Sequence, residues 1–319
     1  MLLIRDRQNL ECDLILVGIT PGGGISDGGH SVMRRWQASG HVNLIGQCIE
    51  PLLRLTFILN STSHFSKPDE DLEREYQKLN SAETLAIKGL GQFERFKAAQ
   101  AFRSLLEEWH ISDFHINEAR GVKDEEDAVH LSDTGANLPA FARTMFEQHP
   151  AEFEKVLAKM RDRVPGIQHV EVKVTEDGRL IVRYQDGAFA EPFIDKNVSD
   201  GTVKMFAYLL LHDPKPHPVL CIEEPENQLY PQLMTLLAEE FLQYSQRGGQ
   251  VFVSTHSPQF LNAVPLESLY HIDKKDGVSC VIPLSADRLV SGLIKGGDKA
   301  GYLWEQGMFH GIAERVAHQ

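Results

Sequence analysis

Two adjacent glutamates at the end of an apolar run are the residues of this chain whose types and spacing most clearly indicate chemistry. Residues 219–222 are Val-Leu-Cys-Ile, typical of a strand buried on both faces, and Glu223 and Glu224 follow directly. Carboxylates at the carboxyl end of such a strand lie where α/β sheets bind ligands. The pattern predicts that Glu223 holds Mg²⁺ and that Glu224 acts as a general base on an attacking water. The alternative is a buried strand that ends in a solvated acidic loop.

A second apolar run, 251–253, is followed by Ser-Thr and then by His256. If both runs are neighbouring strands, the imidazole reaches the same sheet edge and could contact a γ-phosphate. Taken alone, without the acidic strand before it, His256 fits a surface or capping role better.

Ser199, Asp200 and Gly201 open a segment with helical character. A serine hydroxyl, a glycine without a side chain and free backbone N–H groups at a helix start can bind phosphate. Their alternative is a plain helix N-cap, since Ser and Asp are common there.

The surrounding pattern predicts the elements that position these residues. Apolar spacing indicates helices from about 96 to 109, from 137, and at 153–160, ending at Pro165. Alternating valines around an Asp-Gly turn predict a hairpin at 170–182. Helices and strands then alternate, which predicts a largely parallel sheet. The alternating elements are a helix at 201–211, the 219–222 strand, a helix at about 231–246 and the 251–253 strand. A closing hairpin is expected at 269–272 and 278–282.

In this order the motifs resemble those of ABC-type ATPases, in the branch related to RecF and the structural-maintenance-of-chromosomes (SMC) proteins. Residues 198–202 resemble the signature motif, 220–227 the Walker B motif with its catalytic glutamate, and 254–257 the switch histidine. The chain from about 80 to 312, with the tail 303–309, is similar to stand-alone bacterial AAA family ATPases of the AAA_21 type. Glu223 stands where Asp is more usual.

This resemblance implies an α/β fold: a P-loop NTPase-like (ABC-type) sheet with flanking helices and antiparallel hairpins. It also implies ATP and Mg²⁺ as cofactors, with Glu223 as the Mg²⁺ residue and Glu224 and His256 as catalytic residues. In ABC-type dimers the signature motif faces the partner's nucleotide, so Ser199, Asp200 and Gly201 are expected to contact the partner's ATP. DNA repair or anti-phage defence is the role that the resemblance suggests.

A phosphate loop of the form GxxxxGK[ST] is missing from the sequence. The nearest match by spacing uses Gly24, Gly29 and Ser31, with His30 at the lysine position after the apolar run 14–19. Asp27 would put a negative charge into that cradle, and a neutral histidine does not replace a permanent ammonium. We therefore expect residues 1–75 to be a divergent or truncated segment, and residues 76–319 to form the ATPase domain.

Composition narrows the class further. The 319-residue chain is 42% hydrophobic and 24% charged, as globular proteins are, and its net charge of −13 gives no general attraction to nucleic acid, although DNA stays open as a partner. Four scattered cysteines and no apolar run of membrane-spanning length favour a soluble protein of the reducing cytoplasm, with no membrane partner.

Three functions remain open from the sequence. The first is an ATPase working as a homodimer, or as a heterodimer with an ATPase that has the Walker A motif, and an effector nuclease is compatible as a further partner. The second is a non-catalytic regulatory or scaffold subunit. The third, a metal-dependent nuclease using Glu223, Glu224 and Glu226, has less support, because nuclease carboxylates usually converge from several segments.

Overall fold

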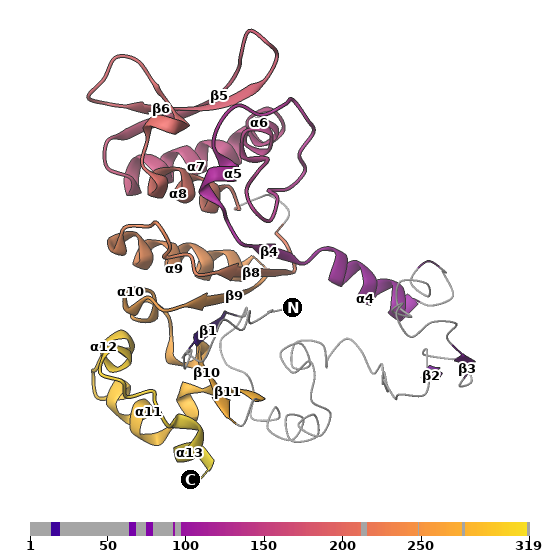
Figure 1. Ribbon diagram of the computed structural model, residues 1–319, viewed down its shortest axis with the longest axis vertical. Coiled ribbons are helices and arrows are strands. Elements are labelled where there is room, and N and C mark those ends of the chain that lie inside the picture. The colour runs from indigo at the N-terminus through magenta and orange to yellow at the C-terminus, as the bar shows by residue number, and fades with distance from the viewer. Residues whose placement is uncertain are drawn as a thin grey trace. The chain divides into compact units, whose positions relative to one another are not determined.

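The computed structural model describes residues 14–19, 64–67, 75–78, 92, 97–211, 216–247, 249–275 and 278–317 (Figure 1). The chain divides into two compact units, one of Met1–Gly24 with His110–Gln319 and one of Ile25–Trp109. Gly24, Gly29 and Ser31 lie outside the described residues. The boundary that the sequence suggested between residues 75 and 76 stays a prediction.

The unit of Ile25–Trp109 contains a short antiparallel pair and a helix. Strand β2 (His64–Lys67) pairs with β3 (Glu75–Lys78), and α4 spans Lys97–Glu107. The helix confirms the amphipathic pattern expected from about 96 to 109.

A six-stranded mixed sheet forms the centre of the larger unit, in the order β11-β10-β1-β9-β8-β4. Its parallel part comprises β4 (His110–Ser112), β8 (Val219–Glu223) and β9 (Gln250–Thr255). The helix α9 (Pro231–Gln246) connects β8 to β9 and packs against β9. The predicted alternation of helix and strand is therefore confirmed, and it brings the carboxyl ends of three strands to one edge.

The direction of strand β1 (Leu14–Ile19) bears on the missing phosphate loop. The strand runs antiparallel both to β9 and to β10 (Leu269–Lys275). In its register Ile15 lies beside Thr255, and Ile19 lies beside Val251. The carboxyl end of β1 is therefore at the edge of the sheet opposite to Glu224 and His256.

A second, three-stranded sheet contains the predicted hairpin. Strands β5 (Ile167–Val174) and β6 (Leu180–Asp186) pair antiparallel, and β7 (Phe193–Ile194) pairs with β6. Helices α6 (Leu138–Gln148) and α7 (Pro150–Arg163) pack against this sheet (Figure 1). Helix α6 begins after Asn137, as its sequence predicted.

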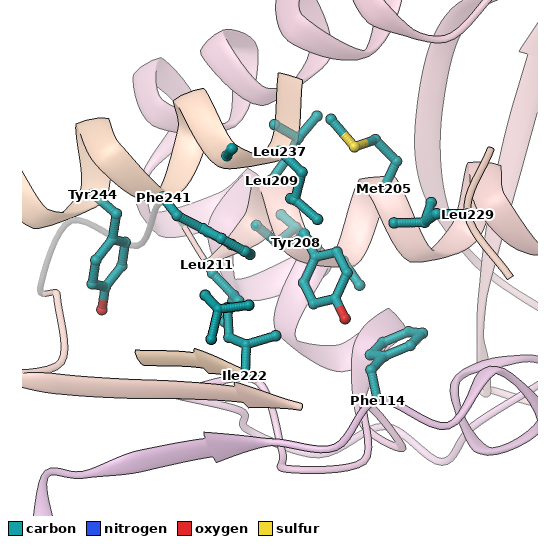
Figure 2. Packing of buried hydrophobic residues seen from close by; sticks show 14 of the residues in the cluster. Phe114, Met205, Tyr208, Leu209, Leu211, Ile222, Leu229, Leu237, Phe241 and Tyr244 are labelled. Atoms are coloured by element: carbon teal, nitrogen blue, oxygen red, sulfur yellow. The ribbon is translucent and has the colours of Figure 1, made fainter. Parts of the chain in front are cut away.

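Helix α8 (Asp200–Leu210) is buried on nearly every side, because its sequence TVKMFAYLL has no continuous polar face. Phe206 makes edge-to-face contacts with Tyr184 of the hairpin and with Phe153 of α7. On another side, Tyr208 contacts Phe241 of α9 and the Phe114 ring, above Ile222 of β8 (Figure 2). The helix thus joins the hairpin layer to the main sheet and fixes its own first turn in space.

The carboxyl-terminal part closes the sheet and adds short helices. Strand β11 (Val278–Pro283) forms the predicted hairpin with β10, and α10 (Pro258–Leu261) follows β9. The later elements are η4 (Leu266–Ser268), η5 (Leu284–Ala286), α11 (Arg288–Lys295), α12 (Ala300–Glu305) and α13 (Ile312–Ala317). A Cβ on Gly301 would lie 2.1 Å from the Pro258 carbonyl oxygen, so only glycine permits this approach of α12 to α10.

Among the described residues, no helix combines the length and the apolar character needed to span a membrane.

Candidate functional site at the carboxyl ends of the parallel strands

Glu223 and Glu224 lie at the carboxyl end of β8, where the chain turns sharply. Glu224 has φ of 38°, in the left-handed region that side chains other than glycine rarely adopt. Its N–H donates to the Ser254 carbonyl oxygen of β9 at 2.9 Å, which helps to hold this conformation. Such backbone geometry costs about 1–3 kcal/mol and persists only where the surroundings enforce it. The turn gives Glu224 a fixed position beside β9.

His256 lies at the carboxyl end of β9, next to Glu224. The His256 Nε2 and Glu224 Oε1 atoms are 3.7 Å apart, with the two side chains 44% and 38% exposed. The Glu224 Oε2 atom also accepts a hydrogen bond from the Asn227 side-chain amide at 3.0 Å. The structure therefore brings together the two residues that the sequence proposed as catalytic, and leaves both accessible to a ligand.

Glu226 positions the segment that carries His256. Its carboxylate accepts a hydrogen bond from the Thr255 hydroxyl at 2.9 Å and another from the His256 backbone N–H at 2.5 Å. Both carboxylate oxygens of Glu226 are therefore used within the protein. This argues against Glu226 as a nuclease metal ligand and assigns it to the support of His256.

Asp113 is an acidic neighbour of Glu223 that sequence reasoning missed. It follows β4, whose Ser112 lies in register with Ile222 of β8. Partial burial of its carboxyl group raises the pKa of Glu223, and the nearby Asp113 and Glu224 carboxylates raise it further. The excess of negative charge at this edge favours a cation.

Mg²⁺ is the cation that the resemblance implies at this edge. Among the described part of the chain, no three His, Cys, Asp or Glu side chains converge as metal ligands. Mg²⁺ commonly takes one or two carboxylates and completes its shell with water and phosphate oxygens. Glu223, at an exposed and acidic strand end, fits that mode of coordination. When bound to a nucleotide, Mg²⁺ supplies charge neutralisation at the phosphates.

Lys204 connects this edge to helix α8. The side chain is buried, and its Nζ atom donates to the Asn227 carbonyl oxygen at 2.7 Å. Burial lowers the pKa of Lys204 to about 8, although Glu226, Asp113 and Glu224 act in the opposite direction. The ammonium group ties the loop after Glu224 to the interior of the unit.

The first turn of α8 carries the three residues that the sequence proposed for nucleotide contact. The Ser199 hydroxyl caps the helix by accepting the Thr202 N–H at 3.2 Å. A Cβ on Gly201 would lie 3.2 Å from the Gln228 carbonyl oxygen, so this turn packs closely on the loop that follows Glu224. Asp200 is half-exposed and pairs with Arg120 at 2.7 Å. Ser199 is thus the N-cap of α8, and this role is independent of any contact with phosphate.

The fold and the site together define a class of protein. Acidic residues follow one parallel strand, a histidine follows the next, and a buried helix begins with Ser-Asp-Gly, which is the arrangement that the sequence motifs predicted. Residues 59–262, nearly two thirds of the chain, match the family described as "AAA domain, putative AbiEii toxin, Type IV TA system" (AAA_21). The chain belongs to this AAA-domain family.

Solved structures of SMC ATPases show similarity to part of the chain. One, from work on ATP-driven dimerization and DNA-stimulated activation of SMC ATPases, has a TM-score of 0.37 and 16% identity, covering 50% of this chain and 98% of that one. The Smc head bound to the C-winged helix domain of ScpA has a TM-score of 0.38 and 14% identity, covering 54% of each chain. A Smc head domain with a coiled coil and joint from Pyrococcus yayanosii has a TM-score of 0.35 and 16% identity, covering 49% of this chain and 31% of its own.

These TM-scores are low, so the assignment rests on the family match. A comparison with curated proteins gave no match.

Proposed function

We propose that this chain hydrolyses ATP at the edge formed by β8 and β9, as one member of a nucleotide-driven dimer. The observation that carries the proposal is the approach of Glu224 and His256, 3.7 Å apart, on two neighbouring parallel strands. Glu224 acts as the general base on water, Glu223 holds Mg²⁺, and His256 contacts the γ-phosphate.

In the proposed dimer, each nucleotide is contacted by residues of both subunits. Ser199, Asp200 and Gly201 face the ATP held by the second subunit, either a second copy or an ATPase that has the Walker A motif. One similar SMC structure comes from work on ATP-driven dimerization and DNA-stimulated activation, and another is bound to the C-winged helix domain of ScpA, so a dimer is the assembly to test here. DNA repair or anti-phage defence, including a toxin–antitoxin role in line with the family's description, is the proposed setting.

A second candidate function is supported by the direction of β1. Because Ile19 lies at the sheet edge opposite to Glu224, the chain leaves β1 on the wrong side for a phosphate loop that continues directly from this strand. In this second candidate the chain is a non-catalytic subunit that donates residues 199–201 to a partner's complete site and binds little ATP alone.

Equilibrium binding and turnover of Mg-ATP by the pure, full chain separates the two candidates. Low-micromolar or tighter binding with measurable phosphate release supports the catalytic function and contradicts the non-catalytic one. Absence of both removes catalysis by the chain alone, and the second candidate then requires that adding this chain stimulate a Walker A-containing partner.

A further inference from the structure

Arg120 contacts the residues on both sides of Ser199, at the start of α8. Its Nη2 atom donates to the Val198 carbonyl oxygen at 2.7 Å, and the same atom lies 2.7 Å from the Asp200 Oδ1 atom. The Arg120 side chain is only 19% exposed, whereas that of Asp200 is 44% exposed. A largely buried guanidinium therefore closes the short loop of residues 198–200, whose outer side faces solvent.

The base of Arg120 is itself fixed to the same loop. Helix α5 (Ile116–Ala119) ends directly before it, and Gly121 follows with φ of 91°, a conformation suited to glycine. The Gly121 N–H donates to the Asp195 carboxylate at 2.6 Å, and Asp195 is buried. Asp195 begins the turn η3 (Asp195–Asn197), which leads into Val198. Residues 120 and 121 thus hold the segment 195–200 at both of its ends.

The charge of Asp200 explains why an arginine is needed at this place. A carboxylate in the first turn stabilises the helix through its dipole. The same carboxylate would repel a phosphate that approaches the free N–H groups of α8. The Arg120 guanidinium offsets that charge, and its Nη2 group contacts both the Val198 carbonyl oxygen and the Asp200 carboxylate.

We propose that Arg120 is a positioning residue for the signature-like loop: it fixes the backbone at Val198 and neutralises Asp200, so that Ser199 and the N–H groups of α8 can receive the partner's nucleotide. This inference rests on the proposed function for its ligand. The part that concerns the loop backbone, which we call the structural half, can be tested without nucleotide, and the neutralisation of Asp200 is the charge half.

Amide hydrogen exchange of the full chain without nucleotide tests the structural half. In Arg120→Met we expect the N–H groups of Thr202 and Val203, which bond to the Ser199 carbonyl oxygen, to exchange about tenfold faster. Arg120→Lys should recover part of the protection. Arg179→Met, at an exposed arginine that pairs with Asp177, is the matched control and should leave these rates unchanged. Unchanged protection in Arg120→Met would overturn the proposal.

The charge half is tested by association of the full chain in Mg-ATP. Arg120→Met should weaken association about tenfold, and Arg120→Met combined with Asp200→Asn should restore most of it, because the repulsive charge is then absent. A purely structural arginine would show no such rescue, so a double variant as weak as the single one overturns the neutralising role. If the wild-type chain shows no response to Mg-ATP, the homodimer form of the proposed function fails, and the exchange rates still support or overturn the positioning role by themselves.

Discussion

We propose that the strand-end edge and the signature-like loop of the larger unit both contact phosphate, yet the two regions are built in opposite ways. Glu224 and His256 keep about two fifths of their side chains exposed, on a backbone held by the neighbouring strand. The 198–200 loop instead depends on buried groups, Arg120 and Asp195, that come from elsewhere in the chain. Groups that do chemistry need access to a ligand, whereas groups that only position a loop gain from burial, because a buried hydrogen bond is less exposed to competing water.

Lys204 and Gly201 connect the two regions. Lys204 extends from α8 to the Asn227 carbonyl oxygen, and Gly201 packs on Gln228. The loop that follows Glu224 therefore contacts the helix that begins at the signature-like residues. A variant of the proposed general base should consequently change turnover, whereas variants that remove a positioning contact in either region should change stability.

Glu224→Gln should have the largest effect. The amide cannot accept a proton from water, so turnover by the ATP-hydrolysing assembly should fall about 10²- to 10⁴-fold, while Mg-ATP stays bound. Phosphate release and nucleotide retention on the same sample measure this. Glu267→Gln, at an exposed position in η4, is the control and should hydrolyse ATP as the wild type does. Steady-state hydrolysis that is the same in Glu224→Gln and wild type removes the catalytic assignment.

Lys204→Met should change the dependence of stability on pH. The folded-state pKa of Lys204 is about 8, below the ordinary 10.5, so the unfolded chain binds more protons between these values. The wild type should therefore gain up to about 3 kcal/mol of unfolding free energy as the pH rises through that window. This gain should be absent in the variant.

Urea unfolding at several pH values from 7 to about 10.5 gives the comparison for Lys204. Lys155→Met removes the same charge from a side chain that is 67% exposed, and its curve should run parallel to that of the wild type. Parallel curves for Lys204→Met as well would show that Lys204 is not the buried ammonium that joins the two regions.

Glu226→Gln should lower stability by about 2 kcal/mol, since it replaces an ionised acceptor of two hydrogen bonds by a neutral amide with one acceptor oxygen. Equilibrium unfolding measures the loss, again with Glu267→Gln as the control. Turnover should also fall, because the His256 backbone loses its anchor. A variant with full stability but no turnover would instead place Glu226 among the catalytic groups.

Much of the fold could be predicted because its signals are local. The apolar runs at 219–222 and 251–253, the helix between them and the Asp-Gly hairpin all depend on residues close in sequence, and each is present. The direction of β1 could not be predicted in this way. An apolar run gives the position of a strand but not the side of the sheet at which it ends.

The residues of the site also differ in whether a local sequence signal predicts them. Glu223, Glu224 and His256 follow predicted strands directly, so their common edge could be inferred. Asp113 escaped notice because β4 has only three residues, too few for a periodic pattern. Arg120 and Asp200 are 80 positions apart, and their contact depends on the packing of α5 against α8. No local signal in one sequence reports such a contact.

Ser199→Ala should have the smallest effect, about 1 kcal/mol of unfolding free energy, because it removes the N-cap of α8. Ser257→Ala is the matched comparison, since Ser257 caps α10 by accepting the Phe260 N–H at 3.3 Å, and it should cost a similar amount. Both variants are then compared for association in Mg-ATP at a temperature where both are folded. If the Ser199 hydroxyl contacts the partner's nucleotide, only Ser199→Ala should weaken association, and Ser199→Thr should retain it. Equal association in the two alanine variants would reduce Ser199 to a helix cap, and the signature-like loop would then differ from the catalytic edge in function as well as in construction.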